Sequence, residues 1–186
     1  MIVFVGGLVG AGKSSVAKSL AKKLELHYYD VDIHKKSIYA ADPDYQHNMQ
    51  QGIPFCEATR FKVFDKVVSD FAELSIDHRH IIVDETLHKK ELRNYLFKGA
   101  EKHFGDYVVV WVKASEKVIL KRLANNERKG HILKDPVKMH NAFLKEFEPF
   151  KQSLIVALND GELDDTLEQI IPLVTEALIK SKVQIE

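Results

Sequence analysis

The sequence predicts a three-layer α/β/α fold with a five-stranded parallel sheet, in a single domain that covers residues 1–186. Short apolar runs rich in β-branched residues recur along the chain, and segments with apolar residues at helical spacing separate them. This alternation is typical of a parallel sheet covered by helices. A chain of 186 residues has about the length of one domain and can bury a substantial core.

Five apolar segments are expected to form the strands. The first is followed by two glycines, and the third by an aspartate. Continuous apolar runs of this kind suit strands that are buried on both faces of a sheet. The segments are residues 2–5, 27–30, 81–83, 107–112 and 153–158.

Helices are expected between these strands and after the last one. Apolar side chains recur at helical spacing, and lysine or arginine fills the positions between them. Asp42-Pro43 and Asp135-Pro136 each place a capping carboxylate before a proline, so both pairs are expected to open helices. The other helices are expected over residues 14–24 and 115–124, along the stripe Phe61, Phe64, Val68 and Phe71, around Leu92, Tyr95 and Leu96, and along the face from Leu163 to Leu178.

Composition excludes several classes of protein. The 27 basic residues balance the 27 acidic residues, so no global field attracts nucleic acid or an anionic membrane. No apolar run reaches the 18 residues of a membrane span, and the apolar residues 1–11 lack the basic start of a signal peptide. Cys56 is the single cysteine. We expect a cytoplasmic monomer or homodimer that acts on a small molecule, with no membrane partner and with nucleic acid disfavoured.

Residues 7–14 read Gly-Leu-Val-Gly-Ala-Gly-Lys-Ser, directly after the first expected strand. Glycines permit backbone geometries in which successive N–H groups point at phosphate oxygens. Lys13 adds charge at the β- and γ-phosphates, Ser14 offers a hydroxyl to Mg²⁺, and the following helix presents its positive N-terminus. The alternative is a glycine-rich turn without a ligand. The expected nucleotide-binding residues are Gly7, Gly10, Ala11, Gly12, Lys13, Ser14 and Ser15, together with Arg122.

Carboxylates follow two of the expected strands. If the extended conformation continues past residue 30, Asp30 and Asp32 project from one face and can share a site. One of them can accept a proton from an attacking hydroxyl while another orients Mg²⁺. Asp84 ends the third strand, where an acidic residue can reach the metal, and Glu85 and Thr86 beside it are further substrate candidates. Helix capping is the alternative for Asp32 and Asp84.

A basic stretch over residues 125–136 is expected to form a mobile lid. An arginine that is delivered by lid closure can stabilise the charge of a transferring phosphoryl group, and Arg128 is the first candidate, with Arg122 second. His131 can orient a phosphate or the substrate. The alternative is an ordinary solvated face, because exposed helices and loops routinely carry lysine and arginine.

With these motifs, the chain resembles the nucleoside-monophosphate-kinase-like P-loop kinases, particularly the gluconate and shikimate kinase group. The segments GLVGAGKSS, YYDVD, NMQQGIPFCEATR, RKGHIL and NAFLKEFEPF are similar to that group's phosphate loop, Asp-x-Asp segment, substrate stretch, lid and following helix. The resemblance implies that residues 32–78 form a substrate-binding helical segment, with Gly52, Pro54 and Arg60 near the substrate. It also places Asn159 and Asp160 near the base of the nucleotide.

The resulting functional hypothesis is an ATP- and Mg²⁺-dependent transfer of the γ-phosphate to a hydroxyl of a small gluconate-like or shikimate-like metabolite. Lys13, Asp30, Asp32 and Arg128 are the expected catalytic residues, and Ser14, Asp30 and Asp84 the expected metal ligands. The expected substrate contacts are Asp32, Gly52, Pro54, Arg60, Asp84 and His131. The segment IIVDETLHKKELRNYL is similar to polynucleotide-kinase-like proteins, so a nucleotide or polynucleotide-end kinase stays open, as does an ATP-binding regulatory module.

Overall fold

The computed structural model describes residues 1–125 and 135–183. Its centre is a five-stranded sheet in the order β2-β3-β1-β4-β5, and all neighbouring strands run parallel. The strands are β1 (Ile2–Gly6), β2 (His27–Asp30), β3 (Ile81–Asp84), β4 (Tyr107–Lys113) and β5 (Ile155–Leu158). The expected strand at 153–158 therefore begins two residues later, and the predicted parallel sheet is confirmed.

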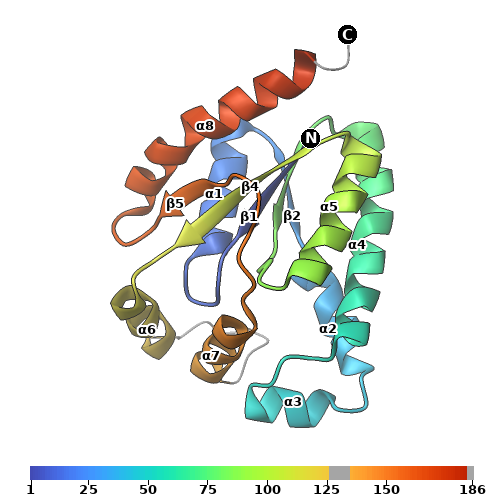
Figure 1. Ribbon diagram of the computed structural model, residues 1–186, viewed down its shortest axis with the longest axis vertical. Coiled ribbons are helices and arrows are strands. Elements are labelled where there is room, and N and C mark those ends of the chain that lie inside the picture. The colour runs from blue at the N-terminus through green and yellow to red at the C-terminus, as the bar shows by residue number, and fades with distance from the viewer. Residues whose placement is uncertain (126–134, 184–186) are drawn as a thin grey trace.

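Two pairs of long helices cover the two faces of the sheet (Figure 1). On one face, Val3 and Val5 of β1 pack against α1 (Lys13–Leu24) and α8 (Leu163–Val183). On the other, Ile2 and Phe4 pack against α4 (Glu57–Asp77) and α5 (Lys90–Phe104). Side chains alternate between the faces of a strand, so the continuous apolar run of β1 supplies both cores. The three-layer fold is the predicted one.

One local expectation is wrong. Asp42-Pro43 does not open a helix, because α3 (Tyr45–Gln51) begins two residues after the proline and Asp42 instead accepts from the backbone N of Asp44 and from the Thr59 hydroxyl.

The helix expected around Leu92, Tyr95 and Leu96 is present as α5, in which both leucines are buried and Tyr95 is 36% exposed. The Tyr95 ring packs on Phe61, and its hydroxyl donates to a carboxylate on α4. Helical spacing alone did not separate this amphipathic side chain from the core-facing ones.

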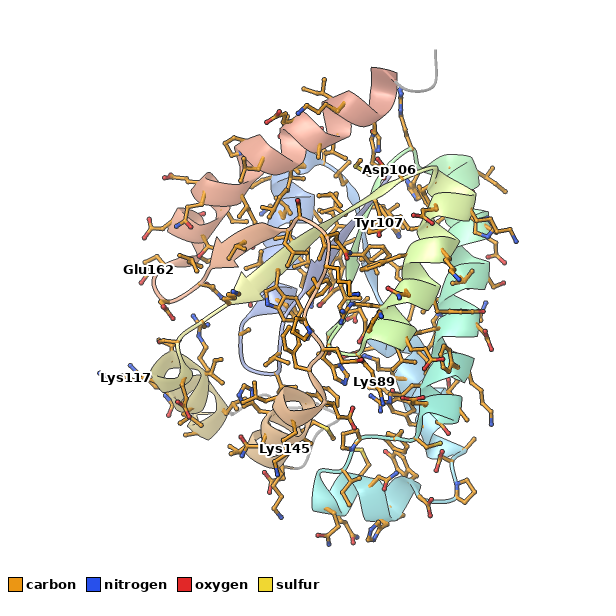
Figure 2. All side chains as sticks on the ribbon, in the orientation of Figure 1. Lys89, Asp106, Tyr107, Lys117, Lys145 and Glu162 are labelled. Carbon is orange, nitrogen blue, oxygen red and sulfur yellow. The ribbon has the colours of Figure 1, made fainter. Side chains whose placement is uncertain are left out.

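Smaller helices gather at the edge of the sheet where the strands end (Figure 1). They are α2 (Asp32–Ala40), α3, α6 (Glu116–Ala124) and α7 (Pro136–Glu146). Asp135 caps α7 as predicted, with its Oδ1 accepting from the Lys138 backbone N at 3.0 Å. In Figure 2, Lys89 and Lys145 lie on this side of the molecule, whereas Asp106 lies at the opposite edge. Ligands of parallel α/β sheets bind at the carboxyl ends of the strands, so this is the edge to search for a site.

Most of the expected lid, residues 126–134, lies outside the described residues. Within the described ranges, no helix is both long and apolar enough to cross a membrane.

Candidate functional site

The phosphate loop joins β1 to α1 and has the backbone geometry that its glycines permit. Gly10 and Gly12 have φ angles of +88° and +92°, which L-residues rarely adopt. At Gly12 a Cβ atom would also lie 2.3 Å from Asn159 Nδ2, and at Gly7 it would lie 2.8 Å from the Val112 carbonyl oxygen. The loop is therefore pressed against β4 and β5, and its N–H groups lead into the N-terminus of α1.

Three side chains from later elements hold this loop. Asn159 Nδ2, at the end of β5, donates to the Ala11 carbonyl at 2.8 Å, and Arg122 Nη1 of α6 donates to the same oxygen at 3.2 Å. His140 of α7 contributes Nδ1 at 2.7 Å from the Val9 carbonyl. A carbonyl only accepts, so Nδ1 carries the proton. The loop is thus fixed from β5, α6 and α7 together.

Lys13 and Asp84 meet at the start of α1. Lys13 Nζ lies 3.9 Å from Asp84 Oδ1, and the Tyr28 hydroxyl donates to Asp84 Oδ2 at 3.2 Å. Asp84 is buried, and its Oδ1 has no hydrogen-bond partner in the described part of the chain. A buried carboxylate oxygen without such a partner beside a phosphate loop fits a site where a cation binds together with phosphate.

The donor atoms near the loop suit magnesium. Ser14 offers a hydroxyl and Asp84 a carboxylate, and hard oxygen ligands are those that Mg²⁺ prefers. Among the described residues, no group of three or more His, Cys, Asp or Glu side chains could hold a metal ion alone. Mg²⁺ usually takes one or two carboxylates from the protein and completes its shell with water and substrate phosphates.

Asp30 and Asp32 do not share an extended strand face. β2 ends at Asp30, Val31 is already helical with φ −62° and ψ −23°, and Asp32 is the first residue of α2. Asp30 Oδ1 accepts from the Asp32 backbone N at 3.0 Å, so Asp30 caps the helix that carries Asp32. Burial, together with Asp32 and Asp84 nearby, raises the pKa of Asp30. Asp32 lines the central cavity, whereas Asp30 does not.

One cavity joins the phosphate loop to a second group of polar side chains. On the loop side it is lined by Gly10, Gly12, Lys13, Ser14, Ser15 and Arg122, and on the far side by Asp32, Lys35, Tyr39, Arg60 and Thr86. Apolar side chains complete the far half, among them Met49, Pro54, Phe55, Met139 and Phe143. Tyr39 and Phe55 stack there with centroids 4.1 Å apart.

Lys35 was not predicted from the sequence. Its Nζ lies 2.8 Å from Asp32 Oδ1 and 2.7 Å from Glu85 Oε2. Burial lowers the pKa of Lys35, but Asp32 and Glu85 raise it more, and the net shift is well above the ordinary value. The ammonium group therefore stays charged. The spacing of three residues from Asp32 on a helix was the available sequence signal.

Arg60 also lines the cavity and is fixed from two sides. Its Nη1 lies 3.1 Å from Glu146 Oε2 of α7 and 3.1 Å from His88 Nε2. Burial, and then the Arg60 charge, lowers the pKa of His88 to about 4, so this histidine is neutral near pH 7. His88 Nε2 also lies 3.2 Å from Glu146 Oε2, and because arginine only donates and a carboxylate only accepts, Nε2 can bond one of the two but not both at once. The His88 ring stacks on Phe143 with centroids 4.1 Å apart. His88 and Glu146 were missed by sequence reasoning.

The remaining expected site residues lie in different places. Pro54 and Arg122 line the cavity. Gly52 ends α3 with φ +64° and packs under α7, where a Cβ atom would lie 2.9 Å from Lys138 Cβ. Asp160 accepts at 2.6 Å from the backbone N of Ser115, the residue directly before α6. Arg128 and His131 lie outside the described residues.

Comparison of the sequence with known protein families identifies the family of this chain. Residues 3–141, most of the chain, match the family described as AAA domain. The chain belongs to this family. The expectation of a P-loop small-molecule kinase fold is confirmed by the matching structures described next.

Similar proteins include a probable gluconokinase of Xenopus tropicalis, which is 25% identical over 144 residues, or 72% of each protein. The crystal structure of a gluconokinase from Sinorhizobium meliloti 1021 superposes with a TM-score of 0.73 at 19% identity and covers 100% of this chain and 97% of its own. A sugar kinase from Janibacter sp. HTCC2649 reaches 0.71 at 18% identity over 94% of both chains. The APS kinase of Mycobacterium tuberculosis, in complex with AMPPNP and APS, reaches 0.63 at 19% identity, over 94% of this chain and 96% of its own. At these identities the structures show a shared fold.

Proposed function

We propose that this protein is an ATP-dependent phosphotransferase that moves the γ-phosphate to a hydroxyl of a small gluconate-like or shikimate-like metabolite. The observation that carries the proposal is the single cavity in which the phosphate loop faces Asp32, Lys35 and Arg60. A phosphoryl transfer needs donor and acceptor in one enclosed space, in line with each other. The gluconokinase and APS kinase names of the similar proteins support a hydroxyl acceptor.

The loop side of the cavity suits the triphosphate of ATP. The backbone from Gly7 to Ser15 would hold the phosphates, Lys13 would contact the β- and γ-phosphates, and Arg122 lies over the loop through its bond to Ala11. Ser14 and Asp84 would hold Mg²⁺, and Asp30 is the more remote metal candidate. When bound, the ion neutralises charge on the β- and γ-oxygens.

In the proposed reaction the acceptor hydroxyl oxygen attacks the γ-phosphorus. The bond from that phosphorus to the β–γ bridging oxygen breaks, and ADP leaves with the electron pair. The hydroxyl proton passes to a carboxylate. Asp32 is our assignment for this base, because it lines the cavity while Asp30 caps α2 instead. Lys13 stabilises the negative charge of the transferring group, a role that we also assign to Arg128 of the lid.

The acceptor side of the cavity favours a hydroxy acid over a long nucleic acid. Arg60 supplies a cation, and Tyr39 and Thr86 add hydroxyl groups. Met49, Phe55 and Phe143 give the same space an apolar wall, against which the carbon skeleton of a small acceptor can pack.

The direct test is substrate-dependent formation of ADP. Purified protein with Mg·ATP is offered sugar acids, cyclic hydroxy acids, nucleosides and oligonucleotides with free ends, and the products are identified by mass spectrometry. We expect a phosphorylated hydroxy acid, and Lys13→Ala should abolish its formation, whereas Lys22→Ala, at an exposed position on the same helix, should not. A phosphorylated nucleoside or oligonucleotide end would show instead that the protein is a nucleotide or polynucleotide-end kinase. ATP binding without any phosphorylated product would favour the regulatory module.

A further inference from the structure

Val31 is fully buried in the core and anchors the backbone at the start of α2, whereas the side chain of Asp32 next to it has to be oriented by other contacts. α2 has no fully buried residue, and the partly buried Ile38 and Tyr39, which pack on the core, lie in its second half. Asp32, the carboxylate assigned as base, lies at the other end of the helix. Because a base must be held within hydrogen-bond reach of the acceptor hydroxyl, polar contacts of the carboxylate itself have to orient it.

His34 ties the backbone of the first turn of α2 to β2 and α4, with its Nε2 3.0 Å from the Tyr29 hydroxyl and 2.6 Å from Asp70 Oδ2. Lys35 instead contacts the Asp32 carboxylate itself and joins it to the end of β3. Its Nζ bridges Asp32 Oδ1 at 2.8 Å and Glu85 Oε2 at 2.7 Å. The side chain of Lys35 is 15% exposed and that of Glu85 is 6% exposed, so solvent screens this bridge weakly. An exposed lysine–aspartate pair within one helical turn would fix little by itself. Here the additional contact with the buried Glu85 holds Lys35, and with it Asp32, in a fixed position.

Glu85 is itself fixed beside the phosphate loop. Its Oε1 accepts from the Thr86 backbone N at 2.8 Å, and the Thr86 carbonyl accepts from the Gly7 backbone N at 3.4 Å. A continuous set of polar contacts therefore runs from Asp32 through Lys35 and Glu85 to the start of the phosphate loop. It links the carboxylate on the acceptor side with the loop on the donor side.

We propose that Lys35 is a positioning residue that holds Asp32 at the acceptor hydroxyl, and that Glu85 acts with it by holding Lys35 against the end of β3. This inference rests on the phosphotransferase function proposed above. It assigns Lys35 to the orientation of the base, and it separates Lys35 from Arg60, whose contacts are to α7 and His88.

The experiment is a double-mutant cycle on the full chain with the acceptor identified in the screen above. Lys35→Met, Glu85→Gln and the double variant are compared with wild type, and Lys36→Met, at the exposed next position of α2, is the matched control. We expect kcat to fall roughly 10- to 100-fold in each single variant, since a displacement of about 1 Å costs that much, with the KM for the acceptor within about threefold of wild type. The kcat of the double variant should be no lower than that of the more impaired single variant, because both residues act through one contact.

The outcomes separate this inference from the proposed function. A wild-type protein without turnover removes both. If wild type is active, a raised acceptor KM with unchanged kcat in Lys35→Met would show that Lys35 binds the acceptor instead. If the fold-losses in kcat of the two single variants multiply in the double variant, Lys35 and Glu85 act independently. Either result overturns the inference. Equal kcat in the Lys35→Met and Lys36→Met proteins also overturns it. Binding of an ATP analogue and thermal unfolding check the fold of each variant. The double variant removes the charges of Lys35 and Glu85 together, so neither charge is left buried without its partner. It therefore tests the loss of kcat even if Lys35→Met does not fold.

Discussion

Gly12 is the residue at which the phosphate loop lies closest to β5. Its φ of +92° belongs to the region that favours glycine, and the Asn159 amide occupies the space where a side chain would begin. That amide donates to the Ala11 carbonyl next to Gly12. The position therefore has two separate requirements, a positive φ and the absence of a Cβ atom, and both serve the cradle for phosphate.

Gly12→Ala should lose both stability and nucleotide affinity. The positive φ alone costs an alanine about 1–2 kcal/mol of folding free energy. In addition, Asn159 must move away from the new Cβ atom, which breaks its bond to Ala11 and disturbs the loop. We expect a lower denaturation midpoint and at least a tenfold weaker binding of an ATP analogue in a direct titration.

Gly105→Ala is the matched control for this substitution. Gly105 also has a positive φ, +80°, but a Cβ atom there would meet nothing within 4 Å. It should lose stability through the backbone and keep wild-type affinity for the analogue. Unchanged affinity in the Gly12→Ala protein would contradict the account of the loop given above.

At the scale of elements, the parts that were predictable are those whose signal is local. The apolar runs of β1 and β4 predicted buried strands, and Asp135-Pro136 predicted the start of α7, because each depends on neighbouring residues. The conformation after Asp30 could not be derived from its pattern. Both an extended continuation and a helix fit the sequence, and the helical backbone of Val31, with the bond from the Asp32 N–H to Asp30, shows that the helix forms.

The candidate site was predictable on the donor side and much less so on the acceptor side. The phosphate loop is a contiguous motif, so Lys13 and Ser14 were found. The contact of Arg60 with Glu146 joins residues 86 positions apart, and that of Arg60 with His88 joins residues 28 apart. No local pattern encodes such pairs, since the fold alone brings α4, α7 and the end of β3 together.

The difference between α2 and α4 gives a prediction for local stability. α4 buries Val63, Val67 and Phe71 among others, whereas α2 has no fully buried residue. Local opening requires less free energy where few apolar contacts are lost, so amides of α2 should exchange hydrogen at least about tenfold faster than those in the middle of α4. Hydrogen exchange followed by mass spectrometry measures both helices in one sample.

The double variant of Lys35 and Glu85 gives a second comparison in the same measurement. Removing Lys35 and Glu85 together should speed exchange in α2 further and leave the middle of α4 unchanged. Exchange in α2 as slow as in α4 would contradict the view that α2 opens more easily than α4.

For the whole molecule, the phosphate loop is the point where distant parts of the chain meet. β1 and α1 supply the loop, and Arg122, His140 and Asn159 hold it from α6, α7 and the end of β5. These elements lie together only in the folded chain. A nucleotide that binds the loop therefore binds the folded state alone, and its binding should stabilise the whole fold.

A nucleotide that binds the folded chain alone should raise the free energy of unfolding by about 2.7 kcal/mol at a concentration of 100 times its Kd. For a domain of this size that corresponds to a rise in Tm of roughly 5–10 °C, which differential scanning calorimetry measures directly. Lys13→Ala should lose most of the shift because it removes the loop's charge for the β- and γ-phosphates, while Lys22→Ala should keep it. The comparison is made with Mg²⁺ and a non-hydrolysable ATP analogue, so that turnover does not alter the ligand concentration. An equal shift in the Lys13→Ala protein would mean that the nucleotide binds elsewhere on the molecule, and the donor half of the proposed site would then be wrong.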